Sequence, residues 1–85
     1  MRYLQITMEV LVTGPLVVEE IKKHRPIIRN NIVLLLSSQT YDVISTREGK
    51  QKIRADVLKE IQKVLQEKTG EPGVDAVYFT SFVVQ

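Results

Sequence analysis

Residues 45–70 read STREGKQKIRADVLKEIQKVLQEKTG and carry the clearest secondary-structure signal in the chain. Apolar residues recur there at helical spacing and predict one long amphipathic helix: Ile53, Val57, Ile61, Val64 and Leu65. Ser45 and Glu48 have the S-x-x-E spacing of a capping box, and Ile44 before them is placed as a hydrophobic staple. Gly70 is placed for a left-handed cap at the end of this helix.

A strand is predicted near each end of the chain. In residues 3–12 (YLQITMEVLV) apolar and polar residues alternate, so one face of a half-buried strand carries Leu4, Ile6, Met8 and Val10. Residues 74–85 (VDAVYFTSFVVQ) are rich in β-branched and aromatic residues. Both faces of this second strand carry apolar side chains, which favours either burial on both sides or a bulge near Ser81.

Two further helices are predicted between the first strand and the long helix. One begins at Pro15, because the missing N–H of a proline would lack a partner at a helix start anyway. Pro26 separates it from the next helix and disfavours helical geometry at Arg25. The second helix covers residues 26–38 (PIIRNNIVLLLSS). Residues 40–45 (TYDVIS) are then expected to form a short connector.

The end of the second helix is the most apolar part of the chain. Its last turn is apolar almost all round, and a helix that is apolar on every side is expected to be buried on every side. Ser37 and Ser38 are expected to end it, since their hydroxyls compete for backbone hydrogen bonds.

The element order is therefore strand, three helices, strand. This order predicts a single α+β domain over residues 1–85, with a small sheet and helices packed on one face. Two strands make a marginal sheet, so a segment outside these residues or another subunit should pair with its outer edges.

Composition narrows the function. Of the 85 residues, 44% are hydrophobic and 26% charged, and the net charge is only +2. The absence of cysteine excludes disulfides, thiolate nucleophiles and zinc–thiolate sites. The longest apolar run is far shorter than the roughly 20 residues of a membrane span, so neither a membrane span nor a cleavable signal sequence is expected within these residues.

No group of residues indicates catalysis. His24 is the only histidine and is expected to be a solvated residue at a helix end. Asp56 and Glu60 lie among lysines, which favours a solvated ion-pair face. Ser37 and Ser38 have no base nearby in the sequence. The residues thus predict a non-enzymatic interaction module without cofactor or metal.

A nucleic-acid-binding module is the weakest alternative. It would require one basic patch from Lys22, Lys23, Arg25 and Arg29. Basic and acidic residues alternate along most of the chain, and no aromatic residues interleave for base stacking.

The order of several short motifs resembles the C-terminal domain of the FliL family, the flagellar basal-body-associated proteins. Beside the two strands, the matching positions are Pro26, Ile28 and Arg29, Leu34 to Ser38, Thr40 and Tyr41, and Ser45, Thr46, Glu48, Gly49 and Lys50. The resemblance covers nearly the whole chain.

This resemblance implies a bacterial inner-membrane protein at the flagellar basal body, with one N-terminal transmembrane helix and a periplasmic domain of stomatin-like (SPFH-like) scaffold fold. It implies homo-oligomeric rings around the stator units, MotA/MotB, that stabilise or activate them and support torque, swarming and motility. It implies no enzymatic activity, cofactor or nucleic-acid partner. Residues 1–85 would be a fragment of the periplasmic domain, without the transmembrane helix and an upstream strand.

A closed ring requires a heterologous interface, in which one patch meets a different patch on the neighbouring copy. The candidates for self-association or stator contact are apolar residues that a small core does not obviously hide: Leu16, Val17, Leu34, Leu36 and Tyr41. Core packing is the alternative for each of them. A stomatin-like membrane scaffold without a flagellar role is the alternative function.

Overall fold

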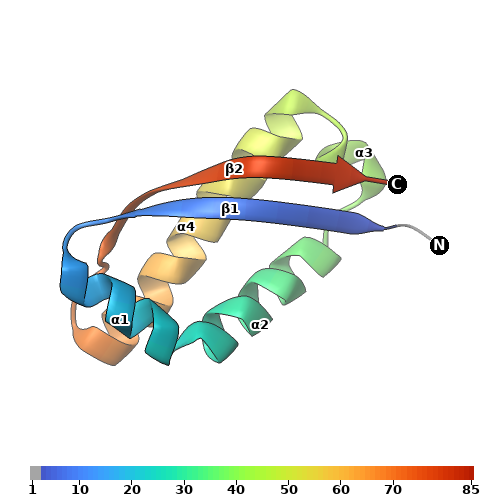
Figure 1. Ribbon diagram of the computed structural model, residues 1–85. Helices are drawn as coiled ribbons and strands as arrows, with labels where there is room; N and C mark the ends of the chain where they lie inside the picture. The colour runs from blue at the N-terminus through green and yellow to red at the C-terminus, as the bar shows by residue number, and fades with distance from the viewer. Residues whose placement is uncertain (1–2) are drawn as a thin grey trace.

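The structure, a computed structural model, describes residues 3–85. Two strands and four helices follow one another as β1 (Leu4–Val12), α1 (Pro15–Lys23), α2 (Arg25–Ser37), α3 (Tyr41–Ile44), α4 (Arg47–Thr69) and β2 (Val74–Val84). The two strands, from opposite ends of the chain, pair antiparallel and lie side by side (Figure 1). The predicted α+β class and the placement of the helices between a first and a last strand are confirmed, with one short helix, α3, beyond the three predicted.

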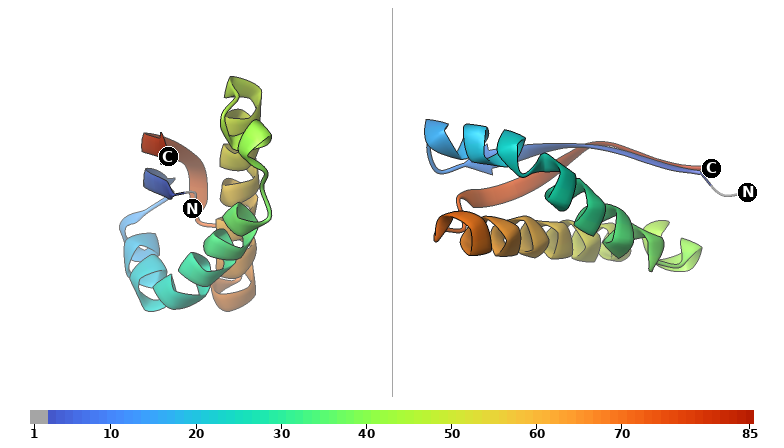
Figure 2. Two further views of the ribbon diagram at one scale, coloured as in Figure 1. Left: turned by 90° about the vertical axis from the view of Figure 1, so that its right-hand side faces the viewer. Right: turned by 90° about the horizontal axis from the view of Figure 1, so that it is seen from below.

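Helices α2 and α4 lie to one side of the two-stranded sheet (Figure 2). Helix α4 runs under β2, α2 packs beside α4, and α1 closes the end of the molecule where β1 finishes. Side chains on the opposite face of β1, such as those of Gln5, Thr7 and Glu9, are exposed. The alternation read in residues 3–12 therefore describes one covered face and one open face.

Two bulges set which side chains of β2 face the helices. The first register shift lies between Thr7 and Met8 and leaves Thr80 without an opposite residue in β1. The second shift lies between Leu11 and Val12 and likewise leaves Asp75 without an opposite residue in β1. Each extra residue shifts the alternation by one, so a set of apolar residues at uneven spacing faces the helices: Val74, Val77, Phe79, Phe82 and Val84. The bulge predicted near Ser81 is confirmed.

Helix α4 supplies half of the core. All five residues that showed helical spacing, from Ile53 to Leu65, are buried. They pack against Ile28 and Ile32 of α2 and against the buried end of β2. Burial of these side chains is the main source of stability for a domain of this size.

The start of α4 differs from the predicted capping box. Thr46, not Ser45, is the N-cap, and its side chain accepts a hydrogen bond from the backbone N–H of Gly49 at 2.9 Å. The reason is that the expected connector forms the single-turn helix α3, so that Ser45 serves as the C-cap of α3. Ile44 is buried within α3 instead of preceding a cap as a staple. At the other end of α4, the left-handed cap at Gly70 is confirmed, with a φ of 86°.

The junction between α1 and α2 also differs from the prediction. The break falls at His24, and Arg25 is already the first residue of α2. Pro26 is tolerated in the first turn of α2 because its missing N–H would have no partner there. Pro15 is confirmed in the first turn of α1.

The end of α2 is less buried than expected. Ser37 and Ser38 do end the helix, and their hydroxyls donate hydrogen bonds to the carbonyls of Val33 and Leu35 at 2.6 and 2.8 Å. However, Val33 and Leu34 are 52% and 61% exposed. One side of the last turns of α2 faces the core, while nothing among residues 3–85 covers the other side. The expectation of burial on every side was therefore wrong for these residues.

Candidate interaction surfaces

The five candidate interface residues divide into two groups. Leu16, Leu34 and Tyr41 are 80%, 61% and 44% exposed. Val17 and Leu36 are half-buried and pack against the core. The first three present apolar surface to the outside, whereas the other two contribute to packing within the domain.

The structure does not bring the three exposed candidates into one patch. Leu16 lies at the start of α1 and Tyr41 at the start of α3, and these two helices lie at opposite ends of the molecule (Figure 1). Leu34 lies in the last turns of α2, which lead toward α3. The three exposed candidates therefore lie toward two separate ends of a body about 37 Å long.

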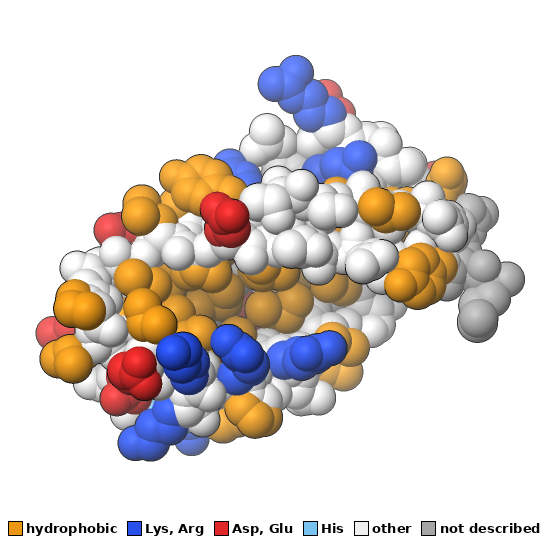
Figure 3. Space-filling model, viewed as in Figure 1, with side chains coloured by type: hydrophobic (Ala, Val, Ile, Leu, Met, Phe, Trp, Pro, Cys, Tyr) orange, Lys and Arg blue, Asp and Glu red, His pale blue; other side chains and the backbone are white. Residues whose placement is uncertain are grey.

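A groove of about 790 Å³ separates β1 from α2. We call it the β1–α2 groove. Its floor is apolar and includes Ile6 and Met8 of β1 and Ile28, Ile32 and Leu36 of α2. Arg25 and Arg29 also line it, and a row of basic side chains follows its α2 side (Figure 3). The inner face of β1 is thus only half covered.

The sheet has two unpaired edges within the described residues. It contains only β1 and β2, so the outer edge of each strand pairs with no other strand between residues 3 and 85. The outer edge of β1 borders the β1–α2 groove. An unpaired edge next to apolar surface is a ready site for pairing with another chain.

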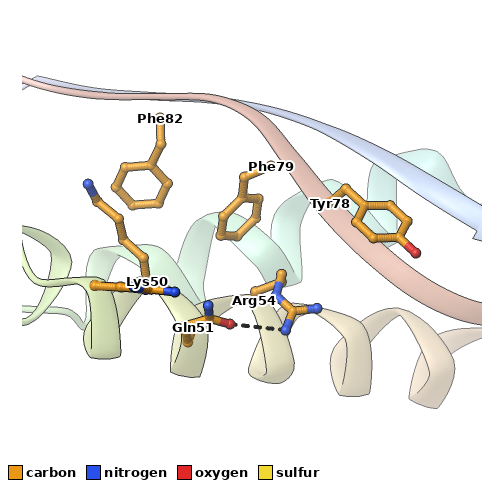
Figure 4. A pocket seen from close by; sticks show the side chains of 7 residues that line it. Lys50, Gln51, Arg54, Tyr78, Phe79 and Phe82 are labelled. Atoms are coloured by element: carbon orange, nitrogen blue, oxygen red, sulfur yellow. Dashed lines mark hydrogen bonds between the residues drawn. The ribbon is translucent and has the colours of Figure 1, made fainter.

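A second groove, of about 510 Å³, lies between β2 and the N-terminal half of α4. We call it the β2–α4 groove. It combines three cationic and three aromatic side chains: Arg47, Lys50, Arg54, Tyr78, Phe79 and Phe82. Figure 4 shows Lys50 extending from α4 toward Phe82, the Phe79 and Phe82 rings extending from β2 toward α4, and Arg54 lying beside Gln51. None of the residues that line it is acidic.

The contacts inside the β2–α4 groove hold its side chains in place. The Lys50 Nζ lies 5.0 Å from the centre of the Phe82 ring, which is a cation–π arrangement. The Phe79 and Phe82 rings are tilted, with their centres 5.4 Å apart. Arg54 donates a hydrogen bond to the side-chain oxygen of Gln51 at 3.1 Å. Within the described residues, none of the three cations forms an ion pair.

The sequence reasoning did not identify this groove. Its aromatic residues are close together in β2, but the cations come from a segment more than twenty residues earlier. The available signal was the spacing of Arg47, Lys50 and Arg54, which puts three cations on one side of a helix.

Other charged candidates have local partners. His24 is not solvated as expected: its side chain is only 15% exposed, and its Nε2 lies 3.4 Å from a Glu20 oxygen. Asp56 pairs with Lys52 at 2.8 Å, as expected for an ion-pair face. Glu60 instead accepts a hydrogen bond from Asn31 at 3.0 Å and so joins α4 to α2.

The residues of the proposed basic patch also differ in their surroundings. Lys22 lies 3.7 Å from Glu19, while Arg25 and Arg29 line the β1–α2 groove. No three histidine or acidic side chains among residues 3–85 are grouped as a metal site would require. No helix in this range combines the length and the hydrophobicity of a membrane span.

Two comparisons with known proteins identify relatives. The family model described as "Flagellar basal body-associated protein FliL" matches residues 1–85. The chain is also 39% identical over 83 residues to the "Flagellar protein FliL" of Aquifex aeolicus (strain VF5). This match covers 98% of the chain and 49% of the relative, so the chain spans about half the length of the curated protein it matches.

Proposed function

Because this chain belongs to the FliL family of flagellar basal body-associated proteins, we propose that it is a non-enzymatic structural domain that assembles with copies of itself into a ring around the stator units of the flagellar motor. Its partners in this proposal are further copies of the chain and the stator proteins MotA/MotB. The family match favours this flagellar role over a stomatin-like scaffold in another setting.

The observation that carries the self-assembly proposal is the position of the exposed apolar residues. Leu16 lies near one end of the molecule, and Leu34 and Tyr41 lie toward the other. A heterologous interface requires two different patches on one subunit, so that the front of one copy can meet the back of the next. Two separate patches fit this requirement, whereas a single patch would favour a closed pair.

The proposed location is the periplasm, with the domain held at the inner membrane by a membrane-spanning helix outside residues 1–85. Family membership supports this location, and a relative about twice as long as the chain has the length for such a helix outside the matched residues. In this arrangement the domain would act by contact, holding stator units in position and stabilising or activating them under load.

Cysteine cross-linking tests the ring directly, because residues 1–85 contain no cysteine, and any cysteine elsewhere in the full-length protein would be replaced by serine. The full-length protein carrying both Leu16→Cys and Leu34→Cys would be treated with a short bismaleimide in membranes of a flagellated host. We expect a ladder of cross-linked species for the double variant and only dimers when the two single variants are mixed. Leu16→Cys/Lys63→Cys, whose second cysteine is at an exposed position on α4, is the control.

The absence of a ladder, or the same ladder from the Leu16→Cys/Lys63→Cys control, would contradict the proposed interface. The stator part of the proposal is tested separately in the same host. We expect Leu34→Asp to reduce swarming and to lower the number of labelled stator units per motor. Wild-type swarming with a wild-type number of stator units would contradict it.

A further inference from the structure

We infer that the β2–α4 groove, together with the outer edge of β2, is a docking site for an extended acidic segment of another protein. This inference does not depend on ring formation, because none of the candidate ring residues lines that groove. It rests on the charge of the groove, on its exposed aromatic surface and on the direction of the backbone groups of β2.

The first argument is charge complementarity. Arg47, Lys50 and Arg54 line the groove, and neither an acidic lining residue nor an ion pair within residues 3–85 neutralises them. Elsewhere on the same helix, Lys52 is paired with Asp56 at 2.8 Å. Unneutralised cations gathered on one side of a groove attract and orient an anionic partner.

The second argument is the aromatic surface between these cations and the strand. Tyr78 is 52% exposed, and Phe79 and Phe82 are only half-buried although they are large. Aromatic and arginine side chains in a shared hollow are typical of protein-binding surfaces. A simple inorganic anion would use the cations and leave this apolar surface exposed.

The third argument is the register of the sheet. Tyr3 and Gln85 exchange both of their backbone hydrogen bonds, each at 2.8 Å. Since hydrogen-bonded and non-hydrogen-bonded pairs alternate in an antiparallel ladder, Val84 and Phe82 occupy non-hydrogen-bonded positions. Their backbone N–H and C=O groups therefore point away from β1, toward the outer edge that no described strand occupies.

These three features fit together at Phe82. Its ring lies in the groove beside the Lys50 ammonium (Figure 4), while its backbone groups point outward along the unpaired edge. A segment added to this edge as a strand would hydrogen-bond to Phe82 and Val84. Its alternate side chains would then face Lys50 and Arg47, which is why acidic residues at every second position are expected in the partner.

Fluorescence anisotropy with a labelled peptide tests the inference. The probe is a peptide of about eight residues, a usual strand length, that alternates glutamate with valine and contains one phenylalanine. We expect saturable binding that weakens as salt is added. The double variant Lys50→Glu/Arg54→Glu should weaken binding by at least about tenfold. The control variant Lys59→Glu/Lys63→Glu changes the net charge by the same amount at exposed positions of α4 outside the groove. It should bind the peptide nearly as well as the parent does.

Two altered peptides test charge recognition and strand pairing separately. A peptide with lysine in place of glutamate should not bind. A peptide with N-methyl groups on alternate amides keeps the charge but cannot pair as a strand, and it should bind much more weakly. Equal binding of the N-methylated peptide would overturn strand pairing, and equal weakening by the two double variants would overturn the groove as the site.

Other occupants give distinct results that would also overturn the inference. One is binding to vesicles containing phosphatidylglycerol, but not to the peptide, in a Lys50-dependent way. Another is concentration-dependent self-association abolished by Lys50→Glu/Arg54→Glu, since the occupant would then be a second copy. Competition of the peptide by inorganic phosphate at equal concentration would reduce the groove to a simple anion site.

Discussion

The hydroxyl of Thr46 accepts a hydrogen bond from the backbone N–H of Gly49 at 2.9 Å and so fixes the first turn of the longest helix. The same hydroxyl donates to the backbone carbonyl of Val43 at 3.1 Å. One side chain therefore joins the end of α3 to the beginning of α4. This geometry explains why a threonine and a glycine are needed three residues apart at this point.

The contribution of the Thr46 cap to the free energy of unfolding should be measurable. Replacing Thr46 with alanine removes the acceptor for the Gly49 N–H and should lower the free energy of unfolding by about 1 kcal/mol. Ser45→Ala is the matched control, because Ser45 makes only one exposed hydrogen bond, at 3.3 Å, to the carbonyl of Asp42. Urea denaturation followed by circular dichroism measures both. Equal losses for the two variants would contradict the assignment of Thr46 as the cap.

Three glycine-to-alanine substitutions should differ in a fixed order. A Cβ on Gly49 would collide with the backbone carbonyl of Val43, so Gly49→Ala should cost about 3 kcal/mol. Gly70→Ala meets no neighbour but is held at a φ of 86°, and it should cost about 1 kcal/mol. Gly14 is extended and has open space around it, so Gly14→Ala should be nearly neutral. Melting temperatures of the three variants test this order, which a neutral Gly49→Ala would break.

Substitution by alanine should lower the free energy of unfolding more at a buried apolar residue than at an exposed one. Val57 is fully buried under the sheet, so Val57→Ala should lower the free energy of unfolding by about 2–3 kcal/mol through lost burial and a residual cavity. Leu34 is 61% exposed, and Leu34→Ala should change it by no more than about 0.5 kcal/mol. Denaturation at low protein concentration keeps association out of the comparison. A large loss for Leu34→Ala would show that Leu34 is a core residue.

The hydrogen bond between Asn31 and Glu60 should couple α2 to α4. The two side chains meet at 3.0 Å across the helix pair and are partly buried. A double-mutant cycle with Asn31→Ala and Glu60→Ala should give a coupling energy of about 1 kcal/mol. Lys52 and Asp56, an ion pair within α4 with 71% of the Lys52 side chain exposed, should give a smaller coupling. A zero coupling for Asn31 and Glu60 would mean that the bond adds nothing to the packing of the two helices.

Local patterns in the sequence were sufficient to predict most of the fold. The helical spacing from Ile53 to Leu65 and the alternation from Leu4 to Val10 each follow from the period of one element, so they can be read without tertiary information. The bulge near Ser81 was also foreseeable, because apolar residues on both faces of a strand require a change of phase.

The differences arise where neighbouring elements compete for the same residues. Ser45 has the spacing of a cap, but it ends α3, and whether Tyr41 to Ile44 form a helical turn depends on the burial of Ile44 against α4. Likewise, the apolar end of α2 does not reveal which of its sides faces the core. To predict the β2–α4 groove, one must know which residues of β2 lie over which residues of α4, and no local sequence pattern contains this information.

Sedimentation velocity across protein concentration tests most directly the proposal that exposed apolar residues of the helices form an interface between copies of this chain. The parent is expected to form larger species as concentration rises, whereas Leu34→Asp and Tyr41→Asp remain monomeric and folded. Lys63→Asp, on the exposed side of α4, should associate like the parent. A parent that sediments as a monomer at every concentration, or variants that associate as well as it does, would contradict the claim.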